Sequence, residues 1–345
     1  MSWKGRAAVY VETDALEFRE EAVEILGPEE VVLKVLGCGV CGTDLHLFHG
    51  EVPLATPPVV LGHEIFAEVV EVGTAVGDLR VGQRVAVDPV IPCRKCEFCQ
   101  SGRPNLCPNM RIMGYHLTGG YAQYTKASRD RLYPLDQRVS MKGGILVETL
   151  ACVVHGYDRL QPLAGSRILI LGAGTVGLLW AQLLRGGESC EVVQVDVIPE
   201  RAEAAARLGA DRAVAVEEGG LRRSLGSLAR DGFDVVIDAT GSPQAIGEGV
   251  ELVRPGGRVM VFGVAPAEAR ISVRPYQLFL NEITILSSKM PPHAFPQAVR
   301  LIEAGKIDVD AIVSHVLPLP DLPEAFELFE KGKDKALKIA IDPWA

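Results

Sequence analysis

Four cysteines lie close together in the first half of the chain, in the run Cys93-Arg-Lys-Cys96-Glu-Phe-Cys99 and then at Cys107. Four thiolates on one loop suit a tetrahedral zinc ion, and no other stretch is so hard to explain without a metal. A site with four cysteine ligands is closed, because no coordination position is left open for a reactant. A zinc enzyme would therefore need a second metal site elsewhere in the chain.

Ligand types of an open zinc site precede this loop. They occur in the runs Cys38-Gly-Val-Cys41-Gly-Thr43-Asp44 and Leu61-Gly62-His63-Glu64. Cysteine, histidine and a carboxylate are the ligands of sites that keep a position for water or substrate, although His63 and Glu64 could also be an ordinary buried pair. The spacing of Cys38 and Cys41 also suits a thiol redox motif, but such a motif opens a helix in a βαβ unit. Because strand and glycine flank it here, we expect no redox motif and place Cys38 in the core.

A glycine motif in the second half predicts a dinucleotide-binding turn. Gly172-Ala-Gly174-Thr175-Val176-Gly177 follows a buried strand at 167–171 and opens an apolar helix to about residue 185. Gly172 makes the tight turn, Gly174 lets the backbone approach a pyrophosphate, and Gly177 lets helix and strand pack closely. The helix N-terminus then binds the phosphates.

Asp196 ends the next strand and can accept both hydroxyls of the adenosine ribose. It would repel a 2′-phosphate, so we expect NAD rather than NADP, although the nearby Arg201 weakens that preference. The expected cofactor contacts are Gly172, Gly174, Thr175, Val176, Gly177, Asp196, Arg201 and Thr240.

Two patterns of secondary structure divide the chain. Up to about residue 90, strand-like runs at 7–11, 30–35, 68–72 and 81–87 alternate with glycine turns, and no helical period is sustained. From residue 167, strands at 167–171, 191–196, 213–216, 234–238, 258–262 and 283–286 alternate with helices at 199–208, 221–229 and 244–252. The fold class is therefore α/β, with a doubly wound, six-stranded parallel sheet beside a β-rich domain. The last segment, with helices at 295–304 and 325–332, a run at 309–316 and a closing strand at 335–341, is expected to complete the first domain.

One acid interrupts the apolar, helix-length segment at 145–157. Glu148 would be costly among Leu, Val and Ala unless it is paired or binds a metal. The alternative is that Glu148 lies at an exposed helix start, where the helix dipole favours an acid.

The composition suits a folded protein with small-molecule partners. The 345 residues are 48% hydrophobic and 23% charged, which fits two core-forming domains and excludes a disordered chain. A net charge of -9 argues against nucleic acid or an anionic membrane as partner. The chain enters a strand-like run without a signal-peptide core, and its eight cysteines are partly clustered, so we expect a cytoplasmic protein with metal-bound thiols.

These motifs together resemble the zinc-dependent medium-chain dehydrogenase/reductase superfamily over essentially the whole chain. The resemblance is closest to the sorbitol (polyol) and threonine dehydrogenase branch. It rests on Cys41-Gly-Thr-Asp, Gly62-His-Glu, the four-cysteine loop, Gly119-Gly-Tyr-Ala-Gln-Tyr and Gly172-Ala-Gly-Thr-Val-Gly. It implies a GroES-like catalytic domain at 1–155 that holds both zinc sites, a Rossmann domain at 156–290, and a return to the catalytic domain at 291–345.

The resemblance also implies roles for single residues. Cys41 and His63 match ligands of the catalytic zinc, Glu64 matches an acid that enters or leaves its coordination sphere, and Glu148 falls where the third ligand lies. Four residues on, Cys152 is the less favoured candidate for that position. Asp44 matches an acid that orients the zinc-bound histidine, Thr43 a hydroxyl that contacts the substrate alcohol, and His46 a proton relay. Cys93, Cys96, Cys99 and Cys107 match the ligands of a structural zinc.

The implied reaction is reversible NAD-dependent oxidation of a secondary alcohol to a ketone, on a polyol, cyclitol or amino alcohol. Polyol dehydrogenases often carry an Arg-Tyr pair near the last segment, but the comparable stretch here is Ser288-Lys289-Met290, where Lys289 could contact a polar substrate. A threonine 3-dehydrogenase-like enzyme and a simple secondary-alcohol or diol dehydrogenase therefore stay open.

Two rival classes are also considered. A metal-free quinone or enoyl reductase would lack the ligand set, and a non-catalytic NAD-binding zinc protein should have lost a ligand or a cofactor glycine. The apolar strand at 283–286 would pair across a dimer if exposed, so a homodimer or homotetramer is expected.

Overall fold

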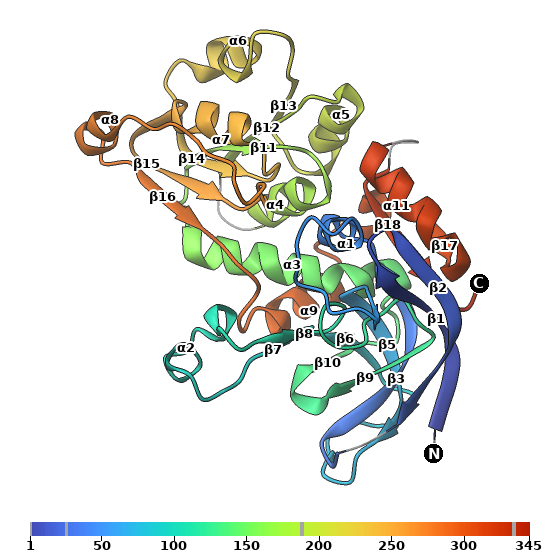
Figure 1. Cartoon of the computed structure of the whole chain (residues 1–345). Helices are drawn as coiled ribbons and strands as arrows, with labels where there is room; N and C mark the ends of the chain where they lie inside the picture. The colour runs from blue at the N-terminus through green and yellow to red at the C-terminus, as the bar shows by residue number, and fades with distance from the viewer. Residues whose placement is uncertain (1, 25–26, 187–189, 333–335) are drawn as a thin grey trace. The chain divides into compact units, whose positions relative to one another are not determined.

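The computed structural model describes residues 2–24, 27–186, 190–332 and 336–345 (Figure 1). The chain forms two compact units. The first comprises Met1–Ala151, Pro292–Gly305 and Val309–Ala345, and the second Cys152–Pro291 with Lys306–Asp308. The boundary falls inside the long helix α3 (Met141–Leu160).

The first unit is rich in β-structure, as the strand-like runs predict. Its strands are β1 (Ser2–Glu12), β2 (Ala15–Glu24), β3 (Glu30–Gly39), β4 (Val59–Val60), β5 (Glu64–Val72), β6 (Arg84–Val87), β7 (Val90–Ile91), β8 (Arg111–Ile112), β9 (Tyr124–Ser128), β10 (Leu132–Leu135), β17 (Val313–Pro318) and β18 (Lys338–Asp342). They form a three-stranded sheet β2-β1-β4, a seven-stranded sheet β10-β6-β5-β3-β18-β17 with β9 also on β3, and a small β7-β8 pair. The C-terminal strand β18 pairs antiparallel with β3 at Cys38 and Gly39, so the end of the chain completes the sheet that carries the first cysteine motif.

The helices of the first unit are short apart from α3. They are α1 (Gly42–Phe48), α2 (Glu97–Gln100), α9 (Phe295–Glu303), α10 (Val309–Ile312) and α11 (Leu322–Lys331), with 3-10 turns at Pro104–Leu106, Arg129–Arg131 and Leu319–Asp321. The expected segment at 309–316 is split between α10 and β17. Lys335, the first residue of the expected closing strand, lies outside the described residues.

Helix α1 corrects the expectation that strand and glycine flank the first cysteine pair, because a helix follows it directly. Cys41 is its N-cap, and the Asp44 carboxylate accepts the backbone N–H of Cys41 at 3.1 Å. A seven-residue helix is too short to show a hydrophobic period in the sequence. It is stabilised at its first turn by this capping bond instead. The helix connects β3 of the seven-stranded sheet with β4 of the three-stranded sheet, so it belongs to no βαβ unit.

The second unit is a six-stranded parallel sheet in the order β13-β12-β11-β14-β15-β16, as the alternating pattern predicts. Its strands are β11 (Arg167–Leu171), β12 (Glu191–Asp196), β13 (Arg212–Ala215), β14 (Phe233–Asp238), β15 (Val253–Val261) and β16 (Thr284–Ser287). Its helices are α4 (Thr175–Arg185), α5 (Pro199–Leu208), α6 (Leu221–Leu225), α7 (Pro243–Val250) and α8 (Pro275–Leu280), and a 3-10 turn at Gly226–Ala229 replaces the end of the helix expected at 221–229. Leu169, Val193, Phe233 and Val236 lie in its buried core.

Gly177 gives a test of this packing. A Cβ at Gly177 would overlap the carbonyl oxygen of Gly172, so helix α4 can approach β11 only through a glycine. We expect Gly177→Ala to lower the free energy of unfolding by about 1–3 kcal/mol in urea, because the added methyl group overpacks this contact.

Gly247→Ala is the matched control, since a Cβ at this position in α7 meets nothing within 4 Å. It should leave stability unchanged or raise it by about 0.5–1 kcal/mol. Equal stability of the two variants would contradict the close approach.

Candidate functional site

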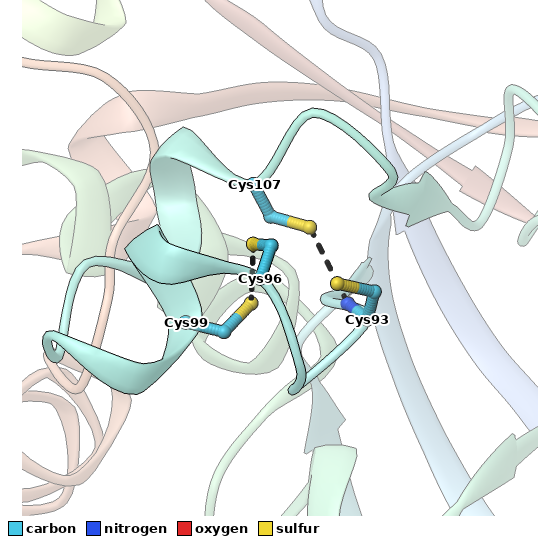
Figure 2. A group of neighbouring side chains, drawn as sticks. All are labelled: Cys93, Cys96, Cys99 and Cys107. Atoms are coloured by element: carbon cyan, nitrogen blue, oxygen red, sulfur yellow. Dashed lines mark hydrogen bonds between the residues drawn. The ribbon is translucent and has the colours of Figure 1, made fainter.

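The four cysteines of the loop between β7 and β8 point toward one another (Figure 2). Each of Cys93, Cys96, Cys99 and Cys107 is a free thiol, and their sulfur atoms lie within 4.8 Å of one another. The sulfurs of Cys96 and Cys99 are 3.4 Å apart, close to the roughly 3.8 Å separation expected in a tetrahedron with Zn–S bonds of about 2.3 Å. The donor set therefore fits a closed zinc site, which would tie this loop together.

The pKa values of these thiols also favour a metal. The backbone N–H of Lys95, with smaller contributions from its neighbours, lowers the pKa of Cys93 to about 6. Loss of solvation raises the pKa of Cys99 to about 12, and its bond with Cys96 acts in the same direction. A divalent cation would favour the ionised form of Cys99, which loss of solvation opposes.

A second group of metal-ligand atoms lies in the same unit. Cys41, His63 and Glu64 each offer one atom, and these atoms also lie within 4.8 Å of one another. Cys41 comes from the N-cap of α1, and His63 and Glu64 from the start of β5. Cys38 is fully buried, as expected for a core residue.

Asp44 positions His63. Its Oδ1 atom contacts Nδ1 of His63 at 3.1 Å, and its Oδ2 atom accepts a 2.8 Å bond from the hydroxyl of Tyr121. Burial lowers the pKa of His63, but the nearby Tyr115 and Asp44 and the bonds to Asp44 and Cys41 outweigh it and hold the pKa well above its ordinary value. Because Tyr115 is a neutral phenol at pH 7, Asp44 is the partner that matters there. With Nδ1 occupied, Nε2 of His63 is left for a metal.

A buried lysine holds Glu64, and sequence reasoning missed it. Lys338, 3% exposed on β18, donates to both carboxylate oxygens of Glu64 at 2.6 and 2.7 Å and to the carbonyl oxygen of Val40 at 3.0 Å. Burial lowers the pKa of Lys338, but the charge of Glu64, with weaker interactions of other neighbours, raises it above its ordinary value. The hydroxyl of Thr149 donates to Glu64 at 2.9 Å. The only sign of this role in the sequence is that Lys338 lies in the apolar strand β18, where a side chain is expected to be buried.

Thr43 and His46 lie on α1, and Glu148 lies on α3. The hydroxyl of Thr43 lies 3.8 Å from the sulfur of Cys41. His46 is exposed on α1 and pairs with Glu51. Glu148 is half-buried in α3, seven residues after the helix begins, so the alternative of an exposed helix start is wrong. Among the described residues, the metal-ligand group of Cys41, His63 and Glu64 does not include Glu148.

Tyr115 is a further neighbour of this group that the motifs did not indicate. Its ring is edge-on to the His63 imidazole, with 5.5 Å between the ring centroids and an interplanar angle of 87°. It lies three residues after β8, in a turn without a periodic pattern, so only the folded chain brings it to His63.

The nucleotide motif is in the second unit and fits a pyrophosphate. Helix α4 starts at Thr175 with Gly174 as N-cap and no side-chain cap, and a Cβ at Gly174 would meet no atom within 4 Å. The hydroxyl oxygen of Thr175 is buried and has no hydrogen-bond partner in the described part of the chain. An open, uncapped helix N-terminus with an unpaired hydroxyl is the arrangement that a bound phosphate would satisfy.

The remaining cofactor candidates surround this turn or lie elsewhere in the second unit. Asp196 is buried, and its two oxygens accept the backbone N–H groups of Ala173 at 2.7 Å and Ile198 at 2.8 Å. A carboxylate has about four acceptor sites, so capacity for ribose hydroxyls remains. The other candidates are half-buried Val176 on α4, half-buried Arg201 on α5, exposed Thr240 after β14, and exposed Lys289 after β16.

Comparisons with known proteins agree with both units. Residues 27–137 match the model of the alcohol dehydrogenase GroES-like domain, and residues 175–304 match the model described as zinc-binding dehydrogenase. The chain is 36% identical to D-arabinitol dehydrogenase 1 of Uromyces fabae, over 93% of this chain and 92% of that one. It is 32% identical to a sorbitol dehydrogenase of Bombyx mori, over 97% of each chain.

Solved structures give the same result. A zinc-binding dehydrogenase from Sinorhizobium meliloti bound to NADP has a TM-score of 0.92 and 32% identity, over 99% of this chain and 100% of that one. A short chain alcohol dehydrogenase of Escherichia coli complexed with NADH has a TM-score of 0.91 and 28% identity, over 98% and 99%.

The four-cysteine loop predicts the zinc content. We expect two zinc ions per chain by elemental analysis in the wild type and one in Cys107→Ser, because three thiolates no longer close the tetrahedron. Cys190→Ser, which changes a cysteine of the second unit outside both groups, should keep two zinc ions. A single zinc ion in a fully active wild type would exclude the two-site interpretation.

The buried ion pair predicts a large effect of Lys338→Met. Removing the ammonium group leaves the Glu64 carboxylate buried without its cation, so the free energy of unfolding should fall by roughly 3–5 kcal/mol in urea. Lys126→Met is the control, because the Lys126–Glu30 pair is partly exposed and should contribute no more than about 1 kcal/mol. Similar losses in both variants would contradict this account of Lys338.

Proposed function

The chain belongs to the zinc-dependent medium-chain dehydrogenase/reductase superfamily, and we propose that it reversibly oxidises a secondary alcohol of a polyol, cyclitol or amino alcohol to a ketone with NAD. Membership makes it a zinc-dependent, NAD(P)-dependent alcohol dehydrogenase that acts on a small-molecule alcohol. The observation that carries the finer proposal is the group of Cys41, His63 and Glu64, whose three ligand atoms suit an open zinc site.

In this proposal, Cys41 and His63 hold the catalytic zinc, with Glu64 or Glu148 as the acid. When bound, zinc would supply a Lewis acid for the alcohol oxygen and the nicotinamide would supply the hydride acceptor. Asp44 keeps His63 in one tautomer, and its bond with Tyr121 holds Asp44 itself in place. Thr43, beside Cys41, would take the alcohol proton while it releases its own hydroxyl proton, and His46, exposed on α1, would accept that proton and pass it to solvent.

The proposal of NAD over NADP depends on Asp196. Solved relatives bind NADP in one case and NADH in another, so the fold accepts both cofactors. Asp196 stands at the C-terminal end of β12, and its charge would repel a 2′-phosphate. Its bonds to the backbone of Ala173 and Ile198 keep that charge in place.

A polar substrate is supported by the names of the relatives, which act on arabinitol and sorbitol. Ser288-Lys289-Met290 replaces the Arg-Tyr pair of many polyol dehydrogenases, so the substrate preference should differ from theirs. A threonine 3-dehydrogenase-like activity and a simple diol activity are the alternatives within the family.

We also propose a cytoplasmic homodimer or homotetramer. Strand β16 is the edge of the parallel sheet, and Ile285 on it, with Tyr276 and Phe279 of the neighbouring segment, is exposed. An apolar edge with unpaired backbone groups would be covered by a second copy.

None of the helices in the described part of the chain has the length and hydropathy needed to cross a bilayer.

A screen of NAD and NADP reduction tests the proposed function. The panel contains D-arabinitol, sorbitol, myo-inositol, L-threonine, 2,3-butanediol and 2-butanol, and we expect the highest kcat/KM with NAD and a polyhydroxy alcohol. No oxidation of any alcohol by the zinc-loaded wild type would refute the proposal, and a preference for 2-butanol or for L-threonine would favour the alternatives.

His63→Ala separates chemistry from cofactor binding. We expect kcat to fall at least about a hundredfold because a zinc ligand is lost, while NADH binding, measured by nicotinamide fluorescence, stays near the wild-type value. The reason is that the nucleotide motif lies in the other unit. Retained turnover would show that the catalytic group has been assigned wrongly.

A further inference from the structure

We propose that the hydroxyl of Tyr115 hydrogen-bonds the substrate hydroxyl next to the reacting carbinol, and so makes the enzyme prefer vicinal diols and polyols over simple secondary alcohols. This inference rests on the proposed alcohol dehydrogenase activity. It assigns a substrate-binding role to a residue outside the metal and nucleotide motifs.

The backbone around Tyr115 is fixed against the segment that carries His63. Gly114 has a φ of +85°, and a Cβ there would lie 2.8 Å from the carbonyl oxygen of Gly62. The backbone N–H of Tyr115 donates to the carbonyl oxygen of Ile112 at 3.2 Å, and its own carbonyl oxygen accepts the N–H of Thr56 at 3.0 Å. The side chain therefore starts from a point that cannot move away from His63 without breaking these contacts.

The ring itself packs against the metal-ligand group. Tyr115 is 6% exposed and meets the His63 imidazole edge-on. An ordinary phenol is neutral at pH 7, so Tyr115 can donate a hydrogen bond beside the candidate zinc site.

The hydroxyl of Tyr115 has no hydrogen-bond partner within the described ranges, and it is not among their buried unpaired atoms, so solvent reaches it although the ring is buried. Tyr121, the other buried tyrosine of this site, differs in this respect, because its hydroxyl is within hydrogen-bond distance of Asp44 at 2.8 Å and of the carbonyl oxygen of Gly39 at 3.3 Å. The Tyr115 hydroxyl is therefore the one that is accessible and not bonded to the protein, so it is free to donate a hydrogen bond to a bound molecule.

A second hydroxyl on the substrate matches this environment. An alcohol oxygen can accept a hydrogen bond from the phenol, whereas an alkyl group in the same place would leave the phenol without a hydrogen-bond partner. A site that hydrogen-bonds a substrate hydroxyl discriminates strongly against the analogue that lacks it. Tyr115 thereby supplies polar recognition in a chain that lacks the Arg-Tyr pair.

The test compares Tyr115→Phe with wild type on 2,3-butanediol and on 2-butanol, which differ by one hydroxyl. We expect kcat/KM for the diol to fall about tenfold or more and that for 2-butanol to change less than about twofold. Tyr133→Phe is the matched control and should leave both values unchanged. Tyr133 is a half-buried tyrosine on strand β10 whose ring stacks on that of Phe295. Zinc content should be that of the wild type in both variants.

Binding without turnover gives an independent measurement. Two ketones that differ by one hydroxyl, 3-hydroxy-3-methyl-2-butanone and 3-methyl-2-butanone, are titrated calorimetrically into the zinc-loaded enzyme saturated with NAD. Neither has a carbinol hydrogen, so no hydride can be transferred. Wild type should bind the hydroxyketone at least about tenfold more tightly than the plain ketone, and Tyr115→Phe should lose this difference.

The outcomes separate the two proposals. Equal losses for diol and mono-alcohol, or equal binding of the two ketones by wild type, would overturn the role of Tyr115 while leaving the dehydrogenase activity intact. If no alcohol is oxidised, the proposed function fails, and the ketone titration still decides whether Tyr115 recognises the neighbouring hydroxyl.

Discussion

Close backbone contact at Gly62 is the constraint on which the metal-ligand group depends. Gly62 has a φ of +90°, a Cβ at Gly114 would lie 2.8 Å from its carbonyl oxygen, and one at Gly119 would overlap that oxygen. Two segments that are distant in sequence, one at Gly62 and one that carries Gly114 and Gly119, thus meet without a side chain between them. Because His63 follows Gly62 directly, its imidazole is held where this junction places it, bonded to Asp44 and in contact with the ring of Tyr115.

Around that junction, the charged side chains are buried as partners of one another. Asp44 takes bonds from His63, Tyr121 and the backbone of Cys41, and the pKa of its carboxyl is lowered even though burial opposes this. Glu64 is bound on both oxygens by Lys338. A metal ion that took Glu64 as ligand would therefore share this carboxylate with an ammonium group, which gives Glu148 a physical reason to be considered as the alternative ligand.

Much of this arrangement could be predicted from local patterns. The alternating strands and helices of the second unit indicated its six-stranded sheet, because each element carries its own hydrophobic period and its own turn residues. Helix α1 escaped prediction, since seven residues with a cap do not make a period. The sequence of 309–316 likewise does not indicate that the run divides into α10 and β17, because so short a run shows no period of either kind.

Spacing along the chain by itself determined the four-cysteine site and the glycine turn, because all of their essential groups lie within one short segment and need only local geometry to meet. The family and the chemistry of an alcohol dehydrogenase follow from those motifs together. Only the tertiary structure decided that Lys338 binds Glu64 and that the ring of Tyr115 stands edge-on to His63. These partners are far apart in sequence, and a contact between distant segments depends on how sheets and turns pack, which no local pattern records.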